Sequence, residues 1–136
     1  MVRSICSVFL ILILCSCKKD DTIPNNSLEG SWKLIEMYAD PGDGSGDFRP
    51  VSSEKTITFK TDGTFSSNGN VCEFSAMADE ATQGSYLALD EGYQIICESE
   101  FSTELRLEVR EGYLIVSFFC IEPCQQKFQR ILFPRE

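Results

Sequence analysis

Short segments of alternating apolar and polar residues run through most of the chain. In the clearest of them, residues 104–110, Leu105, Leu107 and Val109 lie on one side and four charged residues on the other. Because successive side chains of a β-strand point to opposite faces, this pattern predicts a strand with one face in a core and one in water. Eight segments are predicted as strands: residues 31–38, 54–60, 64–67, 84–89, 93–96, 104–110, 113–119 and 125–132.

The predicted strand at residues 113–119 departs from this alternation. Its run Leu114-Ile115-Val116 would place apolar side chains on both faces of the strand. A strand of this kind is expected to be covered on both sides. The cover on the outer face is either a neighbouring segment of the chain or a partner, and the sequence leaves both open.

Tight turns and long connections alternate between the predicted strands. Asp-Gly or Glu-Gly pairs stand in the tight turns, at residues 61–63, 90–92 and 111–112. The longer connections are residues 39–53, 68–83, 97–103 and 120–124. An antiparallel up-and-down arrangement then places every tight turn at one end and every long connection at the other. We therefore predict an all-β fold, an eight-stranded antiparallel up-and-down β-barrel, because closure removes unpaired strand edges.

Four cysteines gather at the end of this barrel that carries the long connections: Cys72, Cys97, Cys120 and Cys124. An even number in an oxidising compartment indicates two disulfides. Cys120 and Cys124 flank a three-residue loop and are natural partners, which leaves Cys72 to pair with Cys97. Pairing of Cys72 with Cys124 or with Cys120 is the alternative.

The N-terminal segment has the pattern of an export signal. Arg3 precedes an apolar stretch at residues 7–14, which is too short to span a bilayer permanently. The run Leu14-Cys15-Ser16-Cys17 that closes it resembles the lipobox of bacterial lipoproteins. That resemblance implies that residues 1–16 are a signal peptide that is removed, and that Cys17 becomes the lipidated first residue.

Cys17 fits this role better than its neighbour does, because a small residue, Ser16, precedes it, whereas Leu14 precedes Cys15. Residues 17–27 are then a lipidated flexible tether, and residues 28–136 form the barrel domain. The run Lys18-Lys19-Asp20-Asp21 is similar to the tag that sends some Gram-negative lipoproteins to the outer face of the outer membrane. We expect a lipid-anchored outer-membrane protein exposed at the cell surface, with a periplasm-facing orientation as the alternative.

Charge and composition exclude several functions. The chain carries 12 basic and 21 acidic residues and a formal net charge of −9, which argues against nucleic acid as a partner. It contains no histidine, the usual general base and metal ligand. The acidic loop at residues 40–47 lacks the spacing of an EF-hand, and Glu73, Asp79 and Glu80 are expected to be solvated. We predict no enzymatic activity, no cofactor and no metal.

Three features of the barrel segment, Gly30-Ser31-Trp32, residues 59–65 and Arg130, resemble the lipocalins, in particular the short lipocalin-like lipoproteins of Gram-negative bacteria. Gly30-Ser31-Trp32 matches the Gly-x-Trp of the first lipocalin strand, and Arg130 matches the arginine of the last strand; residues 59–65 look like the second hairpin of that family. The resemblance implies that Trp32 plugs one end of the barrel and that Arg130 stacks over it. It also implies an interior that holds a small ligand.

Two functions follow as hypotheses. In the first, the membrane-anchored barrel binds a small hydrophobic or amphipathic ligand through the end with the long loops. In the second, the barrel is filled by its own side chains and serves as a non-enzymatic accessory or interaction module of an envelope protein complex. The many aromatic residues, ten Phe and four Tyr, keep the second hypothesis open.

Overall fold

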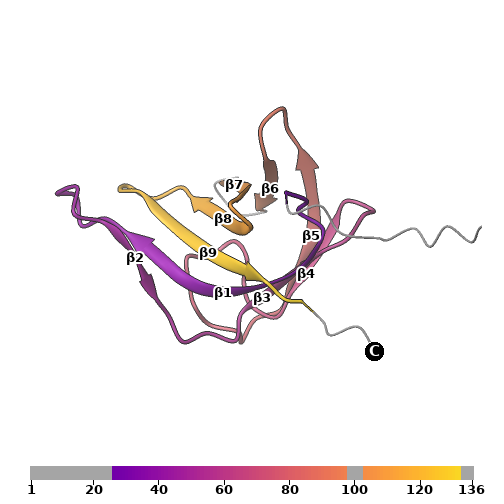
Figure 1. Cartoon of the computed structure of the whole chain (residues 1–136), viewed down its shortest axis with the longest axis horizontal. Coiled ribbons are helices and arrows are strands. Elements are labelled where there is room, and N and C mark those ends of the chain that lie inside the picture. The colour runs from indigo at the N-terminus through magenta and orange to yellow at the C-terminus, as the bar shows by residue number, and fades with distance from the viewer. Residues whose placement is uncertain (1–25, 98–102, 133–136) are drawn as a thin grey trace, which may run out of the picture.

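A computed structural model describes residues 26–97 and 103–132, and all regular structure in these residues is β-strand (Figure 1). The strands are β1 (Gly30–Ala39), β2 (Asp47–Pro50), β3 (Thr56–Phe59), β4 (Thr64–Ser67), β5 (Thr82–Ala88), β6 (Tyr93–Cys97), β7 (Thr103–Arg110), β8 (Tyr113–Phe118) and β9 (Cys124–Arg130). The predicted signal peptide, Cys17 and most of the predicted tether lie outside the described residues.

Eight of these strands close into one antiparallel barrel. The strands β3 to β9 pair in sequence order, and β1 joins the two ends by pairing with β3 on one side and β9 on the other. In Figure 1, β1 and β9 run side by side, in a ladder that extends from Trp32 and Arg130 to Ala39 and Cys124. The predicted eight-stranded up-and-down barrel is confirmed.

One prediction about the connections is wrong. Residues 39–53, expected to be a loop, contain the strand β2, which pairs with the second half of β1 from Ala39–Asp47 to Glu36–Pro50. The strand forms because β1 is ten residues long and β3 pairs only with its first four. The strand β2 covers the remaining edge, and its proline is tolerated because it lies in an edge strand.

Between β2 and β3 the chain leaves the ladder at residues 51–55. Val51 donates a backbone hydrogen bond to Ile35 O (2.9 Å), and Leu34 donates one to Lys55 O (3.0 Å). The register of β1 against β9 shifts at Ile35, which is a β-bulge. At the end of this segment, the side chain of Lys55 is completely buried in the barrel.

Side chains from most of the barrel strands, together with Leu28 and Val71, fill its interior. The buried apolar residues are Leu28, Trp32, Leu34, Ile57, Phe59, Phe65, Val71, Ile95, Cys97, Leu105, Leu107, Leu114, Val116 and Phe128. Each apolar side chain of this size contributes roughly 1.5 to 3 kcal/mol when it is fully buried. Two polar side chains, Lys55 and Gln126, share the interior with them and are buried just as completely.

The two ends of the barrel differ as the alternation of turns predicted. The tight turns lie at the end where Trp32 pairs with Arg130, which we call the closed end. The long connections lie at the opposite end, the open end, where two disulfides join Cys72 to Cys97 and Cys120 to Cys124. The preferred pairing of the cysteines is confirmed.

The outer face of β8 is covered by the chain itself near its start. Ile115 is only 9% exposed, although it pairs with Glu108 and Lys127 on the outward side. The ammonium of Lys127 lies 4.6 Å from the ring centre of Tyr113 and 5.4 Å from that of Phe48, a cation–π arrangement. Of the two covers that the sequence left open, neighbouring segments of the chain are the ones that cover Tyr113 and Ile115.

Gly30 is a position where only glycine fits, and its replacement tests the closed end. Its φ of +118° is unfavourable for other residues, and an added Cβ would lie 2.7 Å from Nη1 of Arg130. We expect Gly30→Ala to lower the free energy of unfolding by about 2 kcal/mol or more, through strain and displacement of Arg130. Denaturant titration of the purified protein measures this loss.

Gly44→Ala is the matched control, because Gly44 also has a positive φ (+76°) but no atom within 4 Å of the added Cβ. Its expected cost is the backbone strain alone, about 1 kcal/mol. Equal losses for the two variants would show that the contact with Arg130 contributes nothing.

Candidate functional site

The closed end is sealed by Trp32 and Arg130. The indole of Trp32 is completely buried, and its Nε1 donates a hydrogen bond to Leu28 O (2.8 Å). The guanidinium carbon of Arg130 lies 4.1 Å from the centre of the Trp32 ring. Arg130 also donates hydrogen bonds to the carbonyls of Ser27 and Glu29. The segment that leads into β1 is therefore clamped across this end of the barrel, and Gly30, Trp32 and Arg130 lie together as predicted.

The open end is covered by residues 68–81, the connection between β4 and β5, which we call the cap loop. Its Val71 is 1% exposed and belongs to the barrel core. Cys72 ties the loop to the end of β6, and the ring of Phe74 packs edge-on against Phe118 of β8 at 5.4 Å. The loop therefore lies inside the mouth of the barrel rather than around its rim.

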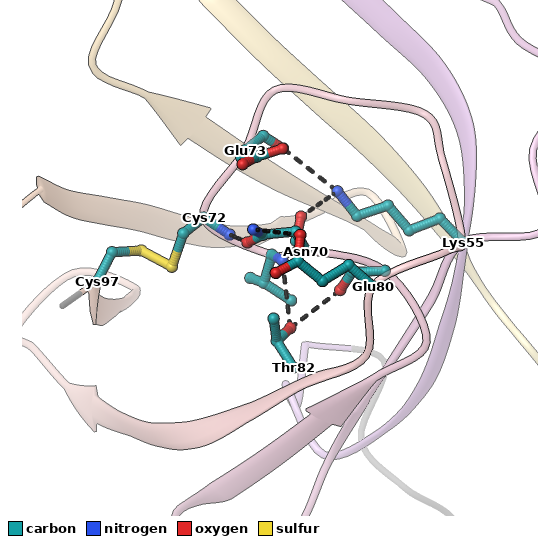
Figure 2. Close-up of a disulfide and its surroundings, with 9 residues drawn as sticks. Lys55, Asn70, Cys72, Glu73, Glu80, Thr82 and Cys97 are labelled. Carbon is teal, nitrogen blue, oxygen red and sulfur yellow. Dashed lines mark hydrogen bonds between the residues drawn. A yellow bond between two sulfur atoms is a disulfide. The ribbon is translucent and has the colours of Figure 1, made fainter. Parts of the chain in front are cut away.

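Lys55 holds the cap loop from within. Its side chain is completely buried and points from the barrel wall toward the loop, as Figure 2 shows. The ammonium donates hydrogen bonds to three backbone carbonyls of the loop: Asn70 (2.7 Å), Ser75 (3.0 Å) and Glu73 (3.3 Å). A buried ammonium without partners would cost several kcal/mol, so these carbonyls are what make its burial tolerable.

Two further side chains of the barrel wall bind the same loop. Gln126 of β9, 1% exposed, donates from Nε2 to Ser75 O (2.9 Å), and Ser53 donates from Oγ to Ala76 O (2.6 Å). The Oε1 atom of Gln126 also lies 3.5 Å from the Lys55 ammonium. The polar groups that an open ligand cavity would present to a ligand are here used by the loop.

Sequence reasoning missed Lys55 and Gln126, although a signal for Lys55 was present. Alternation along β3 puts Ile57 and Phe59 inside the barrel, and counting two residues back places Lys55 on the same face. A lysine at the start of a strand is normally solvated, so only the path of the cap loop reveals its role.

Burial lowers the pKa of Lys55 to about 8 from 10.5, and the nearby carboxylate of Glu73 opposes the shift. Lys55 therefore binds its proton less tightly in the folded state than in the unfolded state. Its protonation opposes folding fully below about pH 8, and this penalty is relieved as the pH rises to 10.5.

Lys55→Met should remove this pH dependence. Relative to the variant, the wild-type protein is expected to gain up to about 3 kcal/mol in free energy of unfolding between about pH 8 and 10.5. Urea titrations over that range measure the gain. Lys33→Met is the control, because Lys33 lies at the surface and pairs with Glu54 at 3.0 Å. A wild-type slope in the Lys55 variant would contradict the assignment.

A groove of about 920 Å³ lies on the outer face of the barrel. Its floor is β7, where Glu104, Arg106 and Glu108 point outward between the buried Leu105 and Leu107. It is lined by Glu91, Gly92, Tyr93, Glu104, Arg106, Leu107, Glu108, Ser117, Phe118 and Phe119. The groove thus runs from the tight turn after β5 to the end of β8.

In the described part of the chain, acidic side chains of the loops are hydrogen-bonded locally or exposed. The carboxylate of Asp40 accepts hydrogen bonds from the backbone N–H groups of Gly42 (2.7 Å) and Gly44 (3.1 Å), which lower its pKa. Glu80 accepts a hydrogen bond from Asn70 (3.3 Å), and Glu73 and Asp79 are exposed. Over residues 26–97 and 103–132, no group of three or more His, Cys, Asp or Glu side chains is placed to hold a metal ion.

The described part of the chain contains no helix that is long and apolar enough to cross a membrane. Comparison with known protein families and with curated proteins finds no match.

Proposed function

We propose that this protein is a membrane-anchored envelope lipoprotein whose barrel is a non-enzymatic interaction module of an envelope protein complex. The observation that carries the proposal is the occupied mouth of the barrel, where Lys55 binds three carbonyls of the cap loop and Val71 completes the core. With its interior full, the barrel offers its loops and outer face for recognition.

A carrier of a small hydrophobic or amphipathic ligand, the other hypothesis, would need space that the cap loop fills. Admitting a ligand would strip the Lys55 ammonium and Gln126 of their partners on the loop. Leaving such a group buried without a hydrogen-bond partner costs about 1 to 3 kcal/mol, and more for a charged group. The Cys72–Cys97 disulfide also keeps the loop close to β6. These features favour the interaction module.

Two observations support the envelope as its location. The sequence up to Cys17 resembles a lipoprotein signal, and the barrel carries two disulfides, which persist in oxidising compartments. The described chain enters the barrel at the closed end, beside Trp32. A lipid at Cys17 would therefore anchor the barrel from that end, at the outer face of the outer membrane or facing the periplasm.

Native mass spectrometry of the protein, gently solubilised from its own membrane, tests the function. An interaction module is expected to retain a partner of protein size at fixed stoichiometry. A ligand carrier would instead show a mass increase of a few hundred daltons, which denaturation releases. A bare monomer in several mild detergents would contradict both functions.

Lipidation is tested by metabolic labelling with a clickable fatty acid. We expect label on the wild-type protein and its loss in Cys17→Ser, because the acyl chains are proposed to sit on that cysteine. Cys15→Ser is the control and should keep the label, since Cys15 belongs to the segment that is removed. If the label is lost in Cys15→Ser and kept in Cys17→Ser, then Cys15 is the lipidated residue.

A further inference from the structure

We propose that the hairpin tip at residues 119–123, together with the adjoining groove on β7, docks a protein partner that presents basic and apolar side chains. This inference rests on the proposed function and assigns the surface that performs it. The tip is the connection between β8 and β9 at the open end, and in Figure 1 it projects on the same side as the connection between β1 and β2.

The tip displays two large apolar side chains that nothing in the described structure covers. Phe119 is 89% exposed and Ile121 is 101% exposed. Single exposed apolar residues are ordinary, but these two flank Cys120 at a projecting tip. An aromatic ring and a branched aliphatic side chain of this kind are suited to insert into a pocket of a partner.

The disulfide makes the tip a prepared binding element. Cys120 and Cys124 close a ring with only three residues between them, and Cys124 is anchored in the ladders with Phe118 and Ala39. Fixing a loop before association reduces the conformational entropy that binding would otherwise cost. Ile121 is therefore held out from the barrel on a loop of restricted motion.

Charge identifies the chemistry of the partner. Phe119 also lines the groove on β7, together with three acidic residues, Glu91, Glu104 and Glu108, and one basic residue, Arg106. Arg110 pairs with Glu108 at 2.5 Å, and Glu122 adds a further carboxylate on the tip itself. The proposed docking surface is thus apolar at the hairpin tip and acidic along the groove on β7.

The charge of the whole molecule excludes two other occupants on physical grounds. With a net charge of −9, a second copy of this chain would bring like charges together at the interface. An anionic lipid surface would be repelled in the same way. A protein segment with lysine or arginine beside apolar residues satisfies both parts of the surface.

Site-specific photo-crosslinking in the native membrane tests this assignment with the full lipidated chain. A benzophenone amino acid replaces Ile121, and in the matched control it replaces Leu132, which is 82% exposed just beyond β9 at the closed end. We expect a discrete protein adduct from position 121 and at most about a tenth of its yield from position 132. We also expect the adduct to weaken about fivefold or more between 0.05 and 0.5 M salt, because salt screens charge complementarity.

Charge reversal supplies the second measurement. Glu104→Lys and Glu122→Lys should each reduce the adduct severalfold, whereas Lys60→Glu, on the exposed tight turn at the closed end, should leave it unchanged. Adducts with lipid or with a second copy, equal yields from positions 121 and 132, or no adduct would each overturn the inference. A partner detected by native mass spectrometry without an adduct at position 121 would leave the proposed function standing and reject this surface.

Discussion

The constraint on which the rest of the structure depends is the ammonium of Lys55 inside the barrel. Removing a charge from water costs several kcal/mol, and the cost is tolerable only where donors find partners. All three carbonyls that satisfy this ammonium belong to one connection, the cap loop. Displacing the loop would break these three hydrogen bonds, so the ammonium stabilises the loop in the mouth of the barrel.

At each end of the barrel, a cationic side chain closes the barrel by binding backbone carbonyls. At the closed end a cation on the last strand, Arg130, donates to the carbonyls of a segment that crosses the barrel. At the open end a cation next to β3, Lys55, donates to the carbonyls of the cap loop. Irregular segments have backbone acceptors that no strand satisfies, and a cationic side chain can bind several of them at once. Packing and hydrogen bonding thus combine to seal a barrel whose strands are short.

Sequence reasoning found the features that local pattern controls. Alternation and Asp-Gly or Glu-Gly turns located the eight barrel strands, and the alternation of turn lengths placed the cysteines at one end and favoured the Cys72–Cys97 pair. The strand β2 was missed because Asp47-Phe48-Arg49-Pro50 has one apolar side chain and a proline. It exists because β1 offers a free edge, and that is a property of the pairing rather than of its own residues.

Less of the candidate site than of the fold could be predicted from the sequence. The role of Lys55 depends on the path of the cap loop. The groove on β7 depends on how the sheet curves, and the alternation of residues predicted only that Glu104 and Arg106 face water. The tip gave a partial signal, since Ile121 is an apolar residue between two cysteines in a predicted connection, whereas Phe119 was assigned to the end of the predicted strand 113–119. In the structure both side chains stay outside the core, with Phe119 89% and Ile121 101% exposed.

The filled interior has a consequence for where recognition can occur. The interior of the barrel holds fourteen buried apolar residues together with Lys55 and Gln126. In such a molecule the strands serve as a rigid support, and binding energy has to come from side chains that point outward. Those side chains divide into two kinds: around Lys127, Tyr113 and Phe48 they satisfy one another, whereas at Phe119 and Ile121 they remain exposed. Burying Phe119 and Ile121 would favour association, and Phe119 adjoins the groove on β7, which distinguishes this tip from the exposed Leu132 at the closed end.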